Sequence, residues 1–450
     1  MQMNKYIKLS SFKNPIILGT LLLTLAGFLT KIIGFFYKIF LSRIFHEEGL
    51  GIIGLISPVL VLVHSISITG LQNAITKYVA AARNEKNNSA YSYLFTGILL
   101  SVSLSAIMGW GVYHYADFIA ASFLNEYRCC ILLRVAALSF PLAALHSCIN
   151  GFFFAYKKAG VPAFTMLVEQ LARVCSVYLL YQYAIKHNTT VSLATSSIGL
   201  FSGECVSAVF SCLFLILWSK KNRTTVSKDT HLLSFQRGSA LCKLSFPLSL
   251  NRICISLLST LETTQLPGKL IASGLTSSQA LSIYGIFSGM AFPLIMFPCA
   301  LTGSAASLML PTISEAQAAG NKKRIKQLIM LTVLFGFLLG IGCMVFFLSF
   351  ADLLGKYLFQ NSEVASQIRA LSLVCPFLYL SGMLNSILHG LGKTTISFIF
   401  SVISVVLRLF FVLYVIPVIG FRGYLYGILS SQICLDLLNI LALRHYIIYN

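Results

Sequence analysis

The sequence predicts an all-α integral membrane protein with twelve transmembrane helices in two parallel six-helix lobes around a central cavity. Three observations lead to this prediction: the composition, the long uncharged segments and an internal repeat. Of the 450 residues, 57% are hydrophobic and only 10% are charged, and mean hydropathy is +0.83. Soluble domains contain about 45–50% apolar and about 25% charged residues. This chain therefore has too few charges to cover a surface in water.

Other protein classes fit the composition poorly. A disordered chain would be poor in apolar residues. The 12 cysteines are scattered without a CxxC pair, mostly inside apolar segments, where a thiol behaves as a small hydrophobic group. Apolar residues form long runs rather than a strict alternation, which indicates membrane helices and not a β-barrel.

The uncharged segments set the length of the predicted helices. Residues 87–116 and 270–314 contain no Asp, Glu, Lys or Arg, and a helix crosses a bilayer with about 20 apolar residues. No cleavable signal peptide is expected, because the first apolar run is long and lacks a small-residue cleavage site. We predict twelve spans, at 15–42, 49–78, 90–115, 129–156, 160–185, 191–218, 241–266, 280–311, 327–350, 368–391, 394–417 and 420–444.

The distribution of Lys and Arg predicts the orientation. If the N-terminus is cytoplasmic, 20 of the 33 basic residues lie in cytoplasmic segments and 7 in outer segments. This asymmetry predicts a multi-pass protein of the cytoplasmic (inner) membrane with both termini in the cytoplasm. The net charge of +20 then reflects loops that face anionic lipid, and it requires no nucleic-acid partner.

An internal repeat relates the two halves of the chain at an offset of 235 residues. The longest polar loop falls between the copies, so we predict an N-terminal lobe at 1–218, a cytoplasmic linker at 219–243 and a C-terminal lobe at 244–450. Each copy holds six spans, an even number, so the copies are parallel. This layout is typical of a transporter that works by alternating access. The repeat pairs Pro58 with Pro293, Arg134 with Arg369, Pro141 with Pro376, Asn150 with Asn385, Lys158 with Lys393, and Arg173 with Arg408.

Prolines recur inside the predicted spans. One interpretation is that membrane helices tolerate proline because neighbouring groups satisfy the freed carbonyls. The other is that the prolines are hinges, and a kink is expected where Pro293 and Pro298 interrupt an uncharged run too long for one straight span. The predicted hinges are Pro58, Pro141, Pro293, Pro298 and Pro376.

Basic residues in the first span are the first candidates for a binding site. Charged side chains within a membrane are costly and usually face a cavity or a partner. Lys31 and Lys38 share one helix face with Gly27 and Gly34, and Lys31 lies roughly 24 Å along the helix from its start. Lys38 and Arg43 continue toward the outer surface, where snorkelling is the alternative interpretation.

Further charges lie within the fifth, seventh and eleventh spans. Arg173 and Arg408 occupy equivalent sites in the two lobes. Arg173 has Glu169 one turn before it, so an intrahelical pair is the alternative to a cavity role, whereas Arg408 has no local partner. Arg252 and Glu262 share the seventh span and are open to pairing with other helices.

Acidic residues near mid-span have two interpretations. Glu204 and Asp436 lie in the sixth and twelfth spans, and they are expected either to neutralise the arginines of their lobes or to titrate during transport. Arg134 and Arg369 lie near the outer ends of their spans, where snorkelling is expected.

The sign of these charges favours an anionic substrate. An exporter of organic cations needs a carboxylate in its cavity, but the first span offers lysines and no acid, which suits a phosphate or diphosphate. The sequence contains no GxxxxGK[ST], HExxH or GxSxG motif, and its eight histidines show no metal-ligand spacing. We therefore expect no enzyme activity, metal or cofactor, with Na⁺ or H⁺ coupling, or an existing gradient, as the driving force.

The N-terminal run GTLLLTLAGFLTKIIGFFYKIFLSRIFHEEGLGIIGLISPV and the later run LPTISEAQAAGN resemble the family of stage V sporulation protein B and related polysaccharide-biosynthesis flippases. This family belongs to the multidrug/oligosaccharidyl-lipid/polysaccharide exporter superfamily. The resemblance implies two six-helix lobes and outward movement of lipid-diphosphate-linked sugars. By resemblance to lipid II flippases, Lys31, Arg43 and Arg252 correspond to cationic cavity positions. Glu262 stands where this family is expected to have Asp.

The residues and the resemblance together predict a flippase for a lipid-diphosphate-linked sugar. Lys31, Arg173, Arg252 and Arg408 would hold the diphosphate, and Lys38 and Arg43 would guide it outward. One alternative is a cation-coupled multidrug or small-molecule antiporter, with Glu262, Glu204 or Asp436 in the cavity. Another is a non-transporting scaffold that recruits envelope-synthesis enzymes. The expected partners are the lipid-linked anionic sugar, membrane lipids and such enzymes.

Overall fold

The computed structural model describes residues 15–82, 89–221 and 235–449, which form helices and short connections without a β-strand. They divide into two compact units. Unit 1 comprises the chain up to Gly34 together with Val59–Ile253, and unit 2 comprises Phe35–Pro58 together with the chain from Cys254 onward.

These units differ from the predicted domain boundaries. Phe35–Pro58, predicted in the N-terminal lobe, groups with unit 2, and residues 244–253, predicted in the C-terminal lobe, group with unit 1. Close backbone packing explains the first difference: a Cβ atom on Gly51 would lie 2.2 Å from the carbonyl oxygen of Leu281. Of the predicted linker, residues 222–234 lie outside the described part of the chain, and 235–243 begin helix α9 (Phe235–Ala272).

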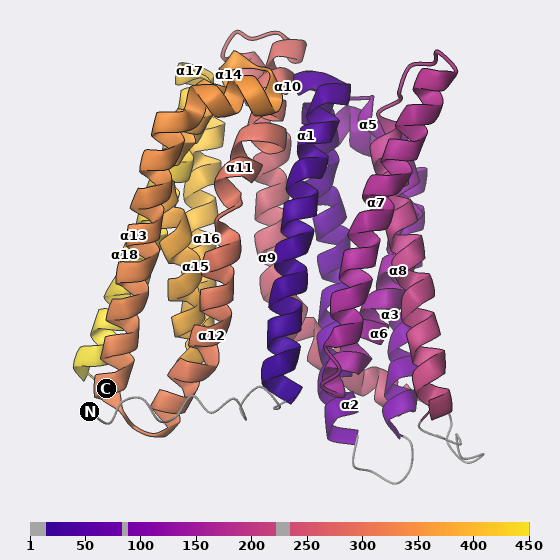
Figure 1. Cartoon of the computed structure of the whole chain (residues 1–450), viewed down its shortest axis with the longest axis vertical. Helices are drawn as coiled ribbons and strands as arrows, with labels where there is room; N and C mark the ends of the chain where they lie inside the picture. Colours follow the sequence, from indigo (N-terminus) through magenta and orange to yellow (C-terminus); the bar gives the residue numbers. More distant parts are fainter. Residues whose placement is uncertain (1–14, 83–88, 222–234, 450) are drawn as a thin grey trace. The chain divides into compact units, whose positions relative to one another are not determined.

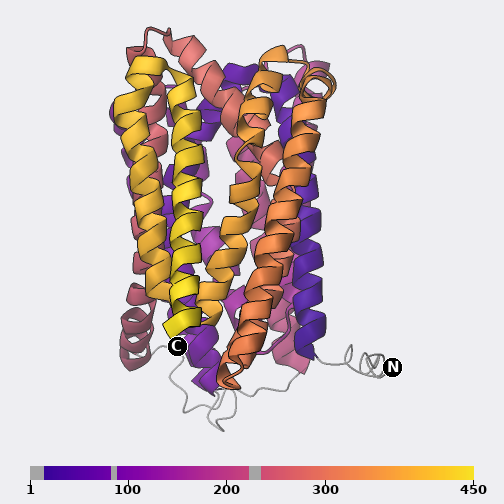
Figure 2. The same cartoon turned by 90° about the vertical axis from the view of Figure 1, so that its left-hand side faces the viewer.

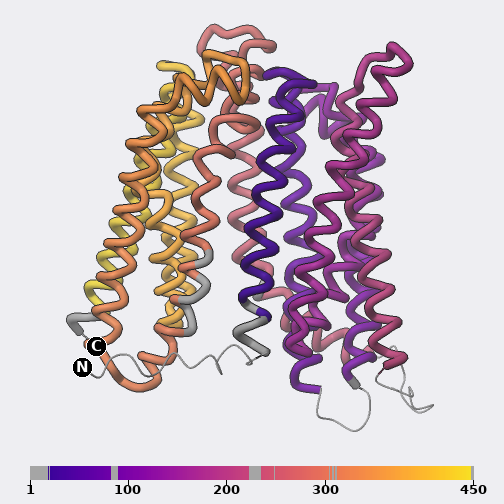
Figure 3. Tube along the Cα trace, viewed as in Figure 1, coloured from indigo at the N-terminus to yellow at the C-terminus, as the bar shows by residue number. Residues whose placement is uncertain are grey.

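Helix α1 (Pro15–His64) contains the first predicted span and the start of the second. It is broken at His46, whose backbone is non-helical (φ 54°, ψ −167°), and the indigo trace in Figure 3 turns at its upper end. After α1 the second span continues through a π-helical turn, η2 (Ser65–Thr69), and α2 (Gly70–Ala82). The break between the first two spans is confirmed.

The number of spans agrees with the prediction. Within the described residues, eight helices are long and apolar enough to cross a membrane, or eleven if each of three bent helix pairs counts as one span. One of the eight, Leu21–Ala82, has 62 residues and would be about 93 Å long if straight, three times the thickness of a bilayer core. Counting its two legs separately gives twelve.

Prolines mark the bends that the sequence predicts. Helices α5 (Cys129–Ala137) and α6 (Phe140–Ala155) meet at 44°, and α14 (Ser362–Ser372) and α15 (Cys375–Gly390) meet at 54°. Pro141 and Pro376 lie in the first turn of α6 and α15, where the missing N–H is tolerated. Their role as hinges stays a prediction.

The predicted kink in the eighth span is confirmed. This span is divided into α10 (Ser277–Gly285), the π-helical η4 (Ile286–Ala291), α11 (Phe292–Met296) and α12 (Cys299–Ala318). Pro293 lies in the first turn of α11, and Pro298 immediately precedes α12.

The internal repeat is visible in the helix boundaries. Both ends of α6 and of α15 differ by the offset of 235 residues. Two ion pairs obey the same offset: Arg134 binds Asp117 at 2.6 Å, and Arg369 binds Asp352. Arg134 and Arg369 thus each have an acidic partner near the end of the preceding span, and their snorkelling stays a prediction.

Unit 1 is a bundle with α6 at its centre (Figure 1). Helix α6 packs against α2, α3 (Ser89–His114) and α8 (Ala194–Lys221), and α8 pairs with α7 (Gly160–Lys186). The core between α2, α3 and α6 includes Ile75, Leu94 and Phe152. Short segments α4 (Ala116–Phe118) and η3 (Ile119–Phe123) connect α3 to α5.

Unit 2 has α15 at the corresponding place. It packs against α12, α13 (Lys322–Leu354) and α18 (Phe421–Tyr449), as Figure 2 shows for α13 and α18. Helix α16 (Thr394–Phe410) pairs with α18. The π-helical turns η5 (Gly355–Phe359) and η6 (Phe411–Val415) follow α13 and α16, and α17 (Ile416–Ile419) leads to α18. Large apolar side chains such as Leu217 and Leu338 are exposed, as expected of surfaces that face lipid.

Candidate functional site

A polar network lies inside unit 1, among helices α6, α7 and α8. His146 and Asn150 share one face of α6, and Glu169 and Arg173 share one face of α7, because each pair is separated by one helical turn. Glu204 comes from α8. His146, Glu169 and Glu204 bring their ligand-capable atoms within 4.8 Å of one another.

A directed chain of hydrogen bonds runs through this network. Thr165 Oγ1 donates to Asn150 Oδ1 at 3.3 Å, which leaves the Asn150 amide nitrogen to donate to His146 Nδ1 at 3.5 Å. An acceptor at Nδ1 implies that the neutral imidazole carries its proton on Nε2. Nε2 then donates to Glu204 Oε2 at 2.7 Å.

The net charge of the network depends on one proton. Arg173 pairs with Glu169 at 2.7 Å, and Glu204 lies 2.7 Å from His146. With His146 neutral and Glu204 ionised, the network carries one net negative charge, which is costly to bury. With His146 protonated, the charges cancel. An imidazole and two carboxylates also form a set that binds divalent metals, although Arg173 already neutralises one of the carboxylates.

Gly203 sets the distance between α7 and α8. A Cβ atom at this position would lie 2.9 Å from the carbonyl oxygen of Glu169 and 3.4 Å from Cβ of Arg173. The absence of a side chain lets α8 approach α7 closely enough for the neighbouring Glu204 to join the network.

Gly203→Ala is therefore expected to destabilise the protein by about 1–3 kcal/mol, because the backbone must shift to remove the overlap. Thermal unfolding of the purified protein in detergent measures this effect. Gly111→Ala is the matched control, since a Cβ atom there meets nothing within 4 Å and alanine favours a helix. Equal melting temperatures for the two variants would contradict the prediction.

His64 and Arg252 belong to unit 1, as does the network. His64 ends α1, and its Nδ1 contacts Thr69 Oγ1 at 3.3 Å.

Lys31 and Arg252 are exposed on spanning helices of unit 1. Within the described parts of the chain, neither forms a hydrogen bond or an ion pair. Of the six cations predicted to bind substrate, these two have no protein partner there.

Unit 2 contains a second charged cluster, built on Glu262 of α9. Its side chain is buried, and Arg408 of α16 binds Oε2 through Nη2 at 3.1 Å and through Nε at 3.2 Å. Tyr424 of α18 donates its hydroxyl to Oε1 at 3.1 Å. Arg408 therefore has a partner, but one that lies 146 residues away in the sequence.

The predicted pairing of acids and arginines needs correction. Of the two interpretations of Glu204 and Asp436, neutralisation of Arg173 and Arg408 is wrong, because the arginines bind Glu169 and Glu262 instead. Titration during transport stays a prediction. Glu204 binds His146. Asp436 is 2% exposed, and neither carboxylate oxygen has a hydrogen-bond partner among the described residues. The i,i+4 alternative for Arg173 agrees with the geometry.

Lys38 and Arg43 contact backbone carbonyls of unit 2. Lys38 Nζ donates to the carbonyl oxygen of Ser288 in η4 at 3.2 Å. Arg43 Nη2 lies 3.5 and 3.4 Å from the carbonyl oxygens of Tyr357 and Leu358 in η5. All three acceptors belong to π-helical turns, whose wider hydrogen-bonding pattern often marks functional sites. These contacts give both cations a structural role.

Sequence reasoning missed His146, Asn150 and Tyr424 as members of the two clusters. The histidine spacing gave no sign of a metal site because the ligand-capable atoms come from three helices. One signal was available: His146 and Asn150 lie one turn apart inside a segment that the internal repeat singles out. Tyr424 carries no such signal, because Glu262 reaches it only through the folding of α9 against α18.

Comparisons with known proteins agree with this architecture. A profile of the family described as polysaccharide biosynthesis protein matches residues 16–317, and a MatE profile matches 247–414. Stage V sporulation protein B of Bacillus subtilis is 25% identical over 95% of this chain and 83% of its own length. The lipid II flippase MurJ of the same organism is 23% identical over 70% of this chain and 61% of its own length.

Solved structures show the same fold. An inward-facing multidrug resistance transporter of the MATE family superposes with a TM-score of 0.71, at 15% identity over 93% of this chain and 94% of that one. The match to the polysaccharide biosynthesis profile covers more than half of the sequence. The chain therefore belongs to the polysaccharide biosynthesis protein family, within the multidrug/oligosaccharidyl-lipid/polysaccharide exporter superfamily of membrane transporters.

Proposed function

We propose that this transporter is a flippase that moves a lipid-diphosphate-linked sugar across the cytoplasmic membrane by alternating access. The observation that carries the proposal is the pair of exposed cations Lys31 and Arg252, which have no partner among the described residues. An exposed cation on a spanning helix faces either hydrocarbon or a water-filled cavity, and hydrocarbon is the costly alternative. Diphosphate oxygens accept the strong charge-assisted hydrogen bonds that such cations offer.

Arg173 and Arg408 are proposed as secondary contacts. Each already binds a carboxylate, but a guanidinium has five N–H donors, and the Nε of Arg173 has no partner among the described residues. Lys38 and Arg43 would act along the exit path. The MurJ relative is named for flipping lipid II, which supports a lipid-linked substrate for this chain.

Cation coupling through the network of His146, Glu169 and Glu204 is the proposed driving force. Its two carboxylates and one imidazole lie within 4.8 Å of one another, and Arg173 pairs with only one of the carboxylates, so the network has the groups needed to take up one proton or one Na⁺. The proposed orientation has both termini in the cytoplasm, following the positive-inside distribution.

The test is flipping of a fluorescent lipid-diphosphate-linked sugar in proteoliposomes. Removing one charge-assisted hydrogen bond costs about 1.5–3 kcal/mol, so K31Q/R252Q is expected to weaken apparent substrate affinity about tenfold or more. K186Q/K220Q, which removes two exposed cations from the ends of α7 and α8, is the matched control. It should flip the substrate like the wild type.

Other experimental results would favour a drug antiporter or a scaffold over a flippase. If K31Q/R252Q flips the lipid normally, the two cations do not bind substrate and the proposal fails. Efflux of a cationic dye that is lost in Glu262→Gln would favour a drug antiporter. Absence of flipping in the wild type, together with normal complementation by K31Q/R252Q in cells, would favour a scaffold.

A further inference from the structure

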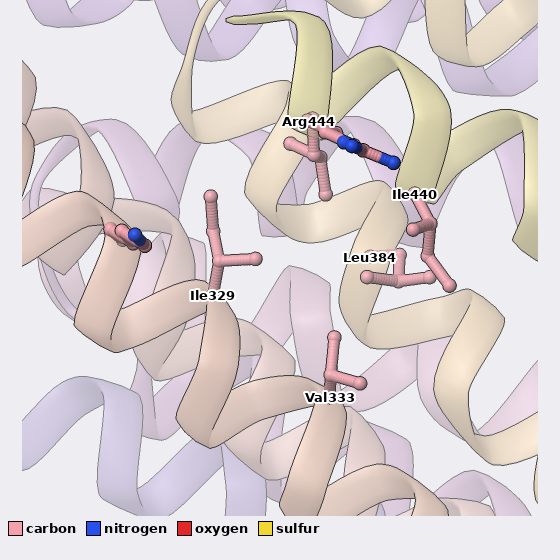
Figure 4. A pocket seen from close by; sticks show the side chains of 7 residues that line it. Ile329, Val333, Leu384, Ile440 and Arg444 are labelled. Carbon is pink, nitrogen blue, oxygen red and sulfur yellow. The ribbon is translucent and has the colours of Figure 1, made fainter. Parts of the chain in front are cut away.

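Unit 2 contains a cavity of about 320 Å³ between α13, α15 and α18. Its walls are apolar and its only charged lining residues are two cations. Figure 4 shows Ile329 and Val333 of α13 across from Leu384 and Ile440, with Arg444 at one edge. The seven lining residues are Lys326, Ile329, Val333, Leu384, Ile440, Leu443 and Arg444.

The two cations have no counter-charge within residues 15–82, 89–221 and 235–449. Lys326 and Arg444 are exposed, and no ion pair or hydrogen bond involves either of them in the parts of the chain that the structure describes. Lys326 also lies near the N-terminus of α13, which begins with Lys322, Lys323 and Arg324 and has no acid in its first turn. Since the helix dipole adds positive potential at this end, the site attracts anions.

The internal repeat indicates that the cavity is not a general feature of the fold. In unit 1 the equivalents of Lys326 and Arg444 are Tyr91 and Val209. Tyr91 is buried in the core with Leu94 and Ile149, the equivalents of Ile329 and Leu384. The apolar walls thus occur in both units. In unit 1 the ring of Tyr91 packs in the core, whereas in unit 2 the equivalent residue, Lys326, lines the cavity.

We infer that this cavity binds an anionic phospholipid, with acyl-chain carbons against Ile329, Val333 and Ile440 and the phosphate between Lys326 and Arg444. Three features point to a lipid. The walls are apolar, the neighbouring faces of α13 and α18 expose Leu334 and Leu441, and basic pockets between membrane helices bind phospholipid head groups. Arginine adds paired hydrogen bonds to phosphate.

The site is distinct from the proposed transport path. None of its lining residues belongs to the two charged clusters or to the six predicted substrate cations. The bound lipid would therefore hold α13 and α18 together against α15 as a resident component of unit 2, and it would not be cargo.

Native mass spectrometry of the full-length protein tests the inference, with phosphatidylglycerol, phosphatidylcholine and a polyprenyl diphosphate as probes. The wild type is expected to retain one phosphatidylglycerol in preference to phosphatidylcholine by about 25-fold, since each of the two basic residues adds about fivefold near a surface. K326Q/R444Q should lose this preference. K186Q/K220Q, which removes two exposed cations of unit 1, should keep it.

A second variant keeps the test independent of charge. Val333→Phe fills the apolar part of the cavity and should lower retention of phosphatidylglycerol while the protein stays monodisperse. The inference is overturned if K326Q/R444Q keeps the wild-type preference, or if Val333→Phe retains the lipid unchanged. It is also overturned if polyprenyl diphosphate displaces phosphatidylglycerol at equal concentration, because the cavity would then be a substrate site.

Discussion

Replacing Glu204 with glutamine is expected to abolish the response of transport to an imposed proton gradient. Glutamine has nearly the same shape, but it removes the ionisable carboxylate of Glu204 and the strong acceptor for His146 Nε2. Loss of one partner in a buried, hydrogen-bonded charge pair costs about 2–5 kcal/mol, so gradient-driven flipping should fall by about tenfold or more. Proteoliposomes with a defined pH difference provide the measurement.

Two controls separate coupling from folding. Glu204→Asp keeps the charge and should recover part of the gradient response. Glu315→Gln removes an exposed carboxylate outside the network and should leave the response intact. Binding of labelled substrate by Glu204→Gln should remain close to that of the wild type. A full gradient response in Glu204→Gln would exclude this network as the coupling site.

Replacing Glu262 with alanine is expected to lower the free energy of unfolding by about 3–5 kcal/mol, because the guanidinium of Arg408 would be left partly buried without a counter-charge. The hydroxyl of Tyr424 would lose its acceptor as well. Thermal unfolding in detergent should show this as the largest loss of stability among single charge substitutions. Lipid binding at the unit 2 cavity, far along α18 in sequence from Tyr424, serves as a check on the native fold.

The double variant E262M/R408L identifies the cause. Replacing both partners of a buried ion pair by apolar side chains is often neutral or stabilising, so this variant should recover most of the stability that Glu262→Ala loses. If the double variant is as unstable as the single one, the loss comes from packing and not from the unpaired charge.

Hydrophobicity alone was sufficient to predict the spans. The twelve apolar runs correspond to the helices or bent helix pairs of the structure, and the mirrored Pro141 and Pro376 predicted where two of them bend. The sequence did not predict which segments belong to which unit, because this depends on close contacts between segments that are distant in the sequence. The packing of Gly51 against the Leu281 carbonyl has no local signature in the sequence.

The charged clusters show the same limit. The Arg173–Glu169 pair follows the i,i+4 spacing of a helix and was available from sequence, whereas the partner of Arg408 comes from a different helix. The spacing of residues in the sequence identifies neighbours on the same helix but not contacts between helices. The partners of Glu204 and Glu262 could be identified only from the three-dimensional structure. The position of Lys31 along its span could be predicted from the sequence.

The assignment of Phe35–Pro58 to unit 2 and of the chain up to Ile253 to unit 1 has a consequence for splitting the molecule. If the polypeptide is cut between Lys221 and Phe235, the first fragment carries a segment that completes the second unit. The second fragment carries the start of α9, which completes the first. Each half is thus missing a piece that the other supplies, so separately synthesised halves have a structural reason to reassemble, and neither is a self-sufficient domain.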